Sequence, residues 1–238
     1  IKYKELCFDL NTELKALRKK NTNIDNTFSK NNIEEINFAK KLMGQIIFLY
    51  FLQKKGWLGI KKNKNGKFDK WGTGPNNFLR RLFNKEYCGY NNFYNDVLED
   101  LFFVGLSVEL PDNYYAKLDC KIPFLNGGLF EPINDYNWQE TNIKINNKII
   151  ENILDAFDRF NFTVAEDEPL ETEVAIDPEM LGKVFENLLD ENLRKGAGSY
   201  YTPRNIVNNM SINSICYYLF EKINKDIDYN DIKKCLTY

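Results

Sequence analysis

Three residues in the middle of the chain have the spacing of a metal-dependent nuclease centre. Asp112 follows a proline, and Asp119 lies two residues before Lys121. In that chemistry two carboxylates hold a magnesium ion, and the lysine positions or activates a water molecule. The spacing also arises by chance, and here it falls in a segment rich in tyrosine and proline rather than on two apolar strands. The alternative interpretation is a pair of solvated loop carboxylates.

Histidine and cysteine limit the other kinds of catalysis. The chain contains no histidine, which excludes Ser-His-Asp and Cys-His catalysis, histidine zinc ligands and a histidine pH switch within it. The cysteines form no Cys-x-x-Cys pair, so a metal knuckle or a redox dithiol is not expected. Free, mostly buried thiols in a reducing cytoplasm are the simplest interpretation of the five cysteines Cys7, Cys88, Cys120, Cys216 and Cys235.

Charge is divided unevenly along the chain. Residues 1–90 carry 19 Lys and Arg against 8 Asp and Glu, whereas residues 91–238 carry 13 against 26. This asymmetry favours a polyanion as partner of the first part, and double-stranded DNA is the partner we predict. The alternative is a solvated face that pairs with the acidic second part. Aromatic residues (Trp57, Phe68, Trp71 and Phe78) are interleaved with the predicted DNA-binding residues, which are Lys61, Lys62, Lys64, Lys67, Lys70, Arg80 and Arg81.

Helices are the commonest predicted elements of the chain. Residues 21–31 are rich in asparagine and predict a loop, and Asn65-Gly66 is a strong hairpin turn signal. Residues 226–238 form a polar tail with a weak pattern. The longest apolar run, 46–52, is far shorter than the roughly 20 residues of a membrane span, so no membrane partner is expected. Hydrophobic spacing predicts helices over 3–20, 33 to about 56, 75–82, 97–106, 149–157, 177–189 and 203–223, a short strand at 160–164 and an irregular segment over 107–137.

Two Gly-x-Gly sequences are candidates for nucleotide-binding loops. Gly72-Thr73-Gly74 and Gly196-Ala197-Gly198 both lack a preceding strand, and neither completes a dinucleotide-binding or phosphate-binding loop. A turn or a close backbone approach explains them better. The sequence LNGGLF at 125–130 likewise predicts a tight turn between apolar anchors.

Three segments together resemble the N6-adenine DNA methyltransferases of bacterial restriction–modification systems, notably the single-chain type IIG restriction enzymes and their phage-defence relatives. The segments are IPFLNGGLFEP at 122–132, DPEMLGKVFENLL at 177–189 and KGAGSYYTPR at 195–204. The last resembles motif X of that family, an aromatic-Thr-Pro turn at a helix start that borders the S-adenosylmethionine pocket. The resemblance implies cofactor contact by Tyr201, Thr202 and Pro203, with Tyr200 as a weaker candidate.

Other parts of the family pattern are missing. The catalytic Asn- or Asp-Pro-Pro-aromatic motif has no counterpart, since the chain contains no Pro-Pro, and the glycine-rich cofactor turn is also missing. In family order both follow motif X. We therefore expect a fragment that is inactive alone and binds S-adenosylmethionine weakly or not at all. Mg²⁺ is expected only if a nuclease domain lies upstream.

The predicted fold is mainly α, with long packed loops and a few short strands, and it ends at the start of a Rossmann-like methyltransferase domain. We expect a helical connector or DNA-contacting region over residues 1–165, followed by a linker and the motif X segment over residues 166–238. Two alternatives stay open: a non-catalytic DNA-binding or coupling module, and a metal-dependent nuclease that uses Asp112, Asp119 and Lys121.

Overall fold

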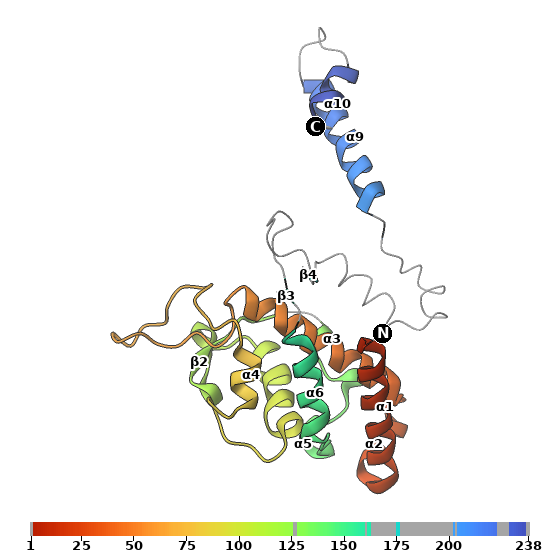
Figure 1. The fold of residues 1–238 in the computed structure, drawn as a ribbon, viewed down its shortest axis with the longest axis vertical. Coiled ribbons are helices and arrows are strands. Elements are labelled where there is room, and N and C mark those ends of the chain that lie inside the picture. Colours follow the sequence, from red (N-terminus) through yellow and green to blue (C-terminus); the bar gives the residue numbers. More distant parts are fainter. Residues whose placement is uncertain are drawn as a thin grey trace. The chain divides into compact units, whose positions relative to one another are not determined.

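The computed structural model confirms a mainly α fold (Figure 1). It divides into two compact units, Ile1–Asp177 and Pro178–Tyr238, and each is described here by itself. The predicted functional boundary at residue 165 stays a prediction. The residues that the structure describes are 2–125, 128–159, 161–162, 175–176, 202, 204–222 and 229–236.

Helix α3 (Glu35–Lys54) is the centre of the first unit. Its buried residues surround the helix, including Leu42, Met43, Ile46 and Leu49. A helix that is apolar on most sides must be covered on most sides. Helix α1 (Lys2–Lys20) packs along α3 (Figure 1), and α6 (Asn147–Phe157) contacts it where the Phe157 ring meets Tyr50. The predicted helices over 3–20, 33–56 and 149–157 are therefore confirmed.

The prediction of a loop over residues 21–31 is wrong. Helix α2 (Thr22–Lys30) begins there, and the Asn21 side chain accepts hydrogen bonds from the backbone N–H groups of Asn23 and Ile24. Ile24 and Phe28, four residues apart, are both buried, so this short helix is held by packing as well as by its cap. Two apolar residues among many polar ones give too weak a pattern to predict this helix from the sequence.

A long helical stretch from Phe93 to Leu106 contains two π-helical turns, η1 (Tyr94–Leu98) and η2 (Leu101–Leu106). It agrees with the predicted helix over 97–106. Glu99 lies between the two π turns and is 1 % exposed. The Tyr136 hydroxyl donates a hydrogen bond of 2.9 Å to Glu99 Oε1. Burial raises the Glu99 pKa to about 8, although the hydroxyls of Tyr136 and Tyr94 oppose the shift.

The irregular segment over 107–137 packs against α3, as a long packed loop should. Gln45 Nε2 donates to the Leu129 carbonyl at 2.8 Å, and the Phe130 ring contacts Phe48 and Phe102. Its only regular pairing within the described residues joins β1 (Tyr114–Tyr115) to β2 (Cys120–Lys121) in antiparallel register. The described residues of the segment also form short helical turns, η3 (Pro111–Asn113), η4 (Ala116–Leu118), η5 (Gly128–Phe130) and η6 (Ile133–Asp135), and helix α5 (Trp138–Thr141) follows it.

The predicted strand near residue 160 is present. Strand β3 (Asn161–Phe162) pairs in parallel with β4 (Ala175–Ile176). In the second unit, α9 (Arg204–Lys222) agrees with the predicted helix over 203–223. The expected helix over 177–189 lies outside the described residues. No helix in the described part of the chain is long and apolar enough to cross a bilayer.

The tail over residues 226–238 contains a helix, α10 (Tyr229–Leu236), which the sequence pattern did not predict. The Tyr229 ring packs against Tyr217 and Phe220 of α9, and Ile232 is buried. Two apolar anchors in eight residues are a weak periodic signal. A helix this short is not stable by itself in water, and its contact with α9 stabilises it.

Candidate nucleic-acid interface

The lysine-rich segment between α3 and α4 (Phe78–Phe83) forms a hairpin that extends away from the helices (Figure 1). Lys62 pairs with Phe68, and the Asn63 N–H donates to the Lys67 carbonyl at 2.8 Å. The Asn63 side chain also accepts from the backbone N–H groups of Asn65 and Lys67. The turn predicted from Asn65-Gly66 is thereby confirmed, with Gly66 at a φ of 73°.

Glycine contacts close the base of this hairpin. The N–H groups of Gly72 and Gly74 both donate to the Gly56 carbonyl, at 3.1 and 2.9 Å. A Cβ at Gly74 would lie 2.2 Å from the Leu58 carbonyl oxygen, so the two backbone segments touch. The first Gly-x-Gly sequence therefore serves a close backbone approach, in agreement with the sequence interpretation.

A backbone pairing also connects the hairpin to β2. Ile60 and Lys121 exchange N–H···O hydrogen bonds of 3.3 and 2.7 Å. This pairing brings Lys121, 61 residues further along the chain, beside the basic hairpin. Lys121 is not among the predicted DNA-binding residues, because only the tertiary pairing places it beside them.

The five predicted lysines of the hairpin are exposed. Lys61 Nζ lies 4.8 Å from the centroid of the Tyr87 ring, and Lys62 Nζ lies 4.4 Å from that of Tyr114. Within the described part of the chain, no ion pair involves any member of the group that we call the hairpin lysines, Lys61, Lys62, Lys64, Lys67 and Lys70. Their positive charge is thus available to an anionic partner.

The two predicted arginines are in a different environment. Arg80 lies 2.7 Å from both Asp155 and Asp158 of the α6 region. The Tyr50 hydroxyl also donates to Asp158 Oδ1 at 2.6 Å. Arg81 pairs with Glu86 at 2.6 Å. Both guanidinium charges are therefore compensated within the protein, and Arg80 connects α4 to α6.

Of the three residues with nuclease spacing, Asp119 and Lys121 contact different side chains. Asp112 is exposed in the turn η3, with a φ of 54°. Asp119 accepts a hydrogen bond of 2.9 Å from the Tyr114 hydroxyl, and Lys121 Nζ lies 4.0 Å from the centroid of the Trp71 ring. Burial raises the pKa of the intervening Cys120 thiol to about 12. Across the described ranges, no three Cys, Asp or Glu residues cluster as metal ligands.

The predicted cofactor contacts lie mostly outside the described residues. Tyr200, Tyr201 and Pro203 are not described, and Thr202 is an exposed residue shortly before α9 begins at Arg204. The family-like segment over 177–189 also lies outside the described residues.

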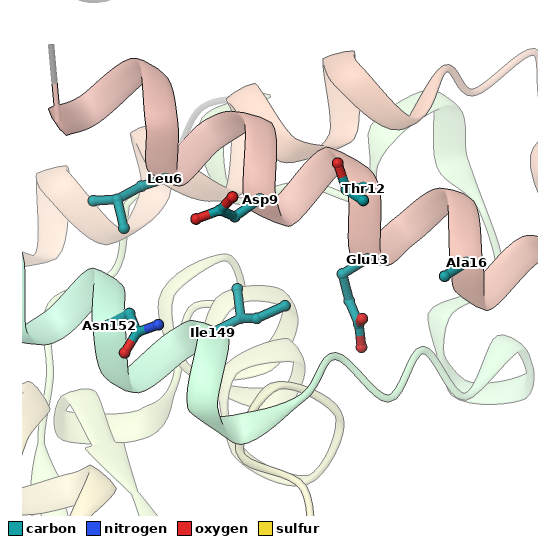
Figure 2. Close-up of a pocket in the computed structure, with 7 residues that line it drawn as sticks. All are labelled: Leu6, Asp9, Thr12, Glu13, Ala16, Ile149 and Asn152. Carbon is teal, nitrogen blue, oxygen red and sulfur yellow. The ribbon is translucent and has the colours of Figure 1, made fainter.

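A shallow cleft of about 310 Å³ lies between α1 and α6 (Figure 2). Leu6 and Glu13 project from α1 and Ile149 from α6, with Asp9 beside them. Two carboxylates at this cleft disfavour a phosphate group. The cleft is therefore not part of the predicted DNA-binding surface. Its lining is completed by Thr12, Ala16 and Asn152.

Comparison with known proteins gives a relative that agrees with the resemblance found in the sequence. In an alignment of 213 residues that covers 84 % of this chain, it is 33 % identical to a protein of Methanocaldococcus jannaschii that is predicted to be a type II restriction enzyme and methyltransferase. The chain spans 16 % of that protein's length. No protein-family model and no solved structure matches the chain. The chain is thus similar to one segment of a restriction–modification protein.

Proposed function

We propose that this chain is the helical, DNA-contacting segment of a restriction–modification enzyme that transfers a methyl group from S-adenosylmethionine to adenine N6. The similarity to a restriction enzyme and methyltransferase supports the class. The exposed hairpin lysines, which no described carboxylate neutralises, are the observation that carries the DNA contact.

The hairpin lysines fit the phosphate backbone of duplex DNA. Each lysine that neutralises a phosphate releases a condensed counterion, so binding weakens as salt rises and is independent of base sequence. Arg80 and Arg81 are compensated by carboxylates, and we therefore restrict the proposed contact to the lysines. Their ammonium groups can exchange an aromatic ring or water for a phosphate without breaking an ion pair.

The proposed cofactor contact rests on the start of α9. This 19-residue helix begins directly after Thr202-Pro203, and the free N–H groups of a helix start favour a carboxylate such as that of the methionine part of S-adenosylmethionine. We keep Tyr200, Tyr201, Thr202 and Pro203 as the proposed contacts. They would form only part of a pocket, so this segment alone should bind the cofactor weakly. Mg²⁺ would be required only by an accompanying nuclease domain.

Fluorescence anisotropy with a labelled blunt 30-base-pair duplex tests the DNA contact. We expect weak, sequence-independent binding that falls steeply between 50 and 200 mM salt. The triple variant Lys61→Glu, Lys62→Glu, Lys64→Glu should abolish it. A triple variant with the same charge change at exposed positions elsewhere, Lys4→Glu, Lys15→Glu, Lys144→Glu, should retain it. Equal loss in both triple variants would refute a local interface.

A methyl-transfer assay separates catalysis from simple binding. The full protein that contains this segment is incubated with DNA and methyl-labelled S-adenosylmethionine, and the nucleosides are analysed after digestion. The expected labelled product is N6-methyl-2′-deoxyadenosine. Label on cytosine would contradict the proposal that adenine is the methylated base. If the protein binds DNA but transfers no label to it, the segment would be a non-catalytic coupling module.

A further inference from the structure

Two tryptophans at the base of the hairpin are unusually exposed. Trp57 is 38 % and Trp71 40 % exposed, whereas most large aromatic side chains of this unit are buried. Their ring centroids lie 6.5 Å apart, and the ring planes are inclined by 58°. At that inclination the two rings are not stacked face to face.

An ammonium group accompanies each of these rings. Lys55 Nζ lies 5.6 Å from the centroid of Trp57, and Lys121 Nζ lies 4.0 Å from that of Trp71. Because each ammonium lies over one face of its ring, a base would stack on the other face while the cation attracts the phosphate. These are the two chemical features that recognise one nucleotide. The hairpin lysines extend the positive charge from this point.

The glycine contacts hold the two tryptophans together. Gly56 directly precedes Trp57, and Gly72 directly follows Trp71, and these glycines are joined by the hydrogen bond from Gly72 N–H to the Gly56 carbonyl. A Cβ at Gly56 would lie 2.5 Å from the Gly72 carbonyl oxygen. This backbone contact fixes the positions of Trp57 and Trp71 relative to each other. The two residues would therefore lose little conformational freedom when a ligand binds.

We propose that Trp57 and Trp71 form a stacking site for unpaired bases of single-stranded DNA; this proposal rests on the proposed DNA contact of the hairpin. In a continuous duplex, neighbouring base pairs already cover the base faces, and only their edges are open in the grooves. An aromatic ring face can therefore select an unpaired base. The hairpin lysines hold the phosphate backbone, and the tryptophans distinguish single strands from duplex.

Tryptophan fluorescence reports on this site directly. The chain has three tryptophans, and the third, Trp138, packs against Phe103. A Trp138→Phe background leaves only the two proposed stacking residues to emit. Titration with a 20-residue oligothymidylate should quench their emission. Changing Trp71 to leucine should raise the Kd for oligothymidylate at least about fivefold. This corresponds to the lower end of the binding free energy contributed by one base stacked on an aromatic ring. Affinity for the blunt 30-base-pair duplex should stay unchanged.

The outcomes separate the two proposals. If the duplex binds through the hairpin lysines but oligothymidylate leaves the emission unchanged, the stacking site is refuted and the DNA contact stands. Equal weakening of single strand and duplex by Trp71→Leu would also refute it. If neither DNA binds, both proposals fail. The quenching experiment keeps Trp57 and Trp71 intact. It therefore tests the stacking site even if Trp71→Leu does not fold.

Discussion

Replacement of Glu99 by glutamine should change how the stability of the protein depends on pH. Glutamine preserves the size of the side chain and its ability to hydrogen-bond with Tyr136 and Tyr94, but it cannot ionise. Glu99 is 1 % exposed, and burial raises its pKa from 4.5 to about 8. The variant therefore removes one buried titrating group and leaves its neighbours in place.

The sign of the effect follows from proton uptake. The unfolded chain releases the Glu99 proton near pH 4.5, whereas the folded protein keeps it until about pH 8. Between these values folding takes up a proton, so the free energy of unfolding falls as pH rises. The fall is about 1.4 kcal/mol per pH unit. From pH 5 to pH 8 this one group should cost the wild-type protein on the order of 4 kcal/mol.

Urea unfolding followed by circular dichroism at pH 5 and pH 8, with constant ionic strength, measures this cost. Glu99→Gln should gain stability relative to wild type as pH rises, by on the order of 4 kcal/mol over the interval. Glu140→Gln, a matched change at an exposed position, should follow the wild-type curve. Parallel curves for wild type and Glu99→Gln would show that Glu99 is not protonated in the folded state, and the reasoning would fail.

Three further substitutions test the framework around the hairpin. Arg80→Met should lower the free energy of unfolding by about 1 kcal/mol, because it removes partly exposed ion pairs. Duplex affinity in the anisotropy assay should not change. A loss of affinity like that of the lysine triple variant would show that Arg80 contacts DNA. Gly74→Ala should cost more than about 2 kcal/mol, because its Cβ would meet the Leu58 carbonyl oxygen. Gly66→Ala, where no atom lies within 4 Å, should cost only about 1–2 kcal/mol for its positive φ. Thermal unfolding compares the two, and equal losses would contradict a close backbone contact at the hairpin base.

Helices with a regular apolar pattern could be predicted from sequence. Leu10 and Leu14 of α1 and Ile150, Ile153 and Leu154 of α6 are all buried, as helical spacing requires. Helices α2 and α10 could not, because each has only two or three apolar anchors among polar residues. Their stability depends on contacts with a neighbouring helix, such as Arg18 of α1 with Asp25 of α2 at 2.7 Å. Local periodicity does not report such contacts.

The hairpin turn, its lysines and the resemblance to adenine methyltransferases could be recognised without a structure, because each depends on residues close together in the chain. The tertiary structure, in contrast, controls which cations are available to a ligand. It compensates Arg80 with Asp155 and Asp158, 75 and 78 residues away, and it brings Lys121 to Trp71. It also buries Glu99 among tyrosines. A residue's type sets its charge, but the desolvation and the neighbouring charges that control its chemistry arise only when distant segments pack together.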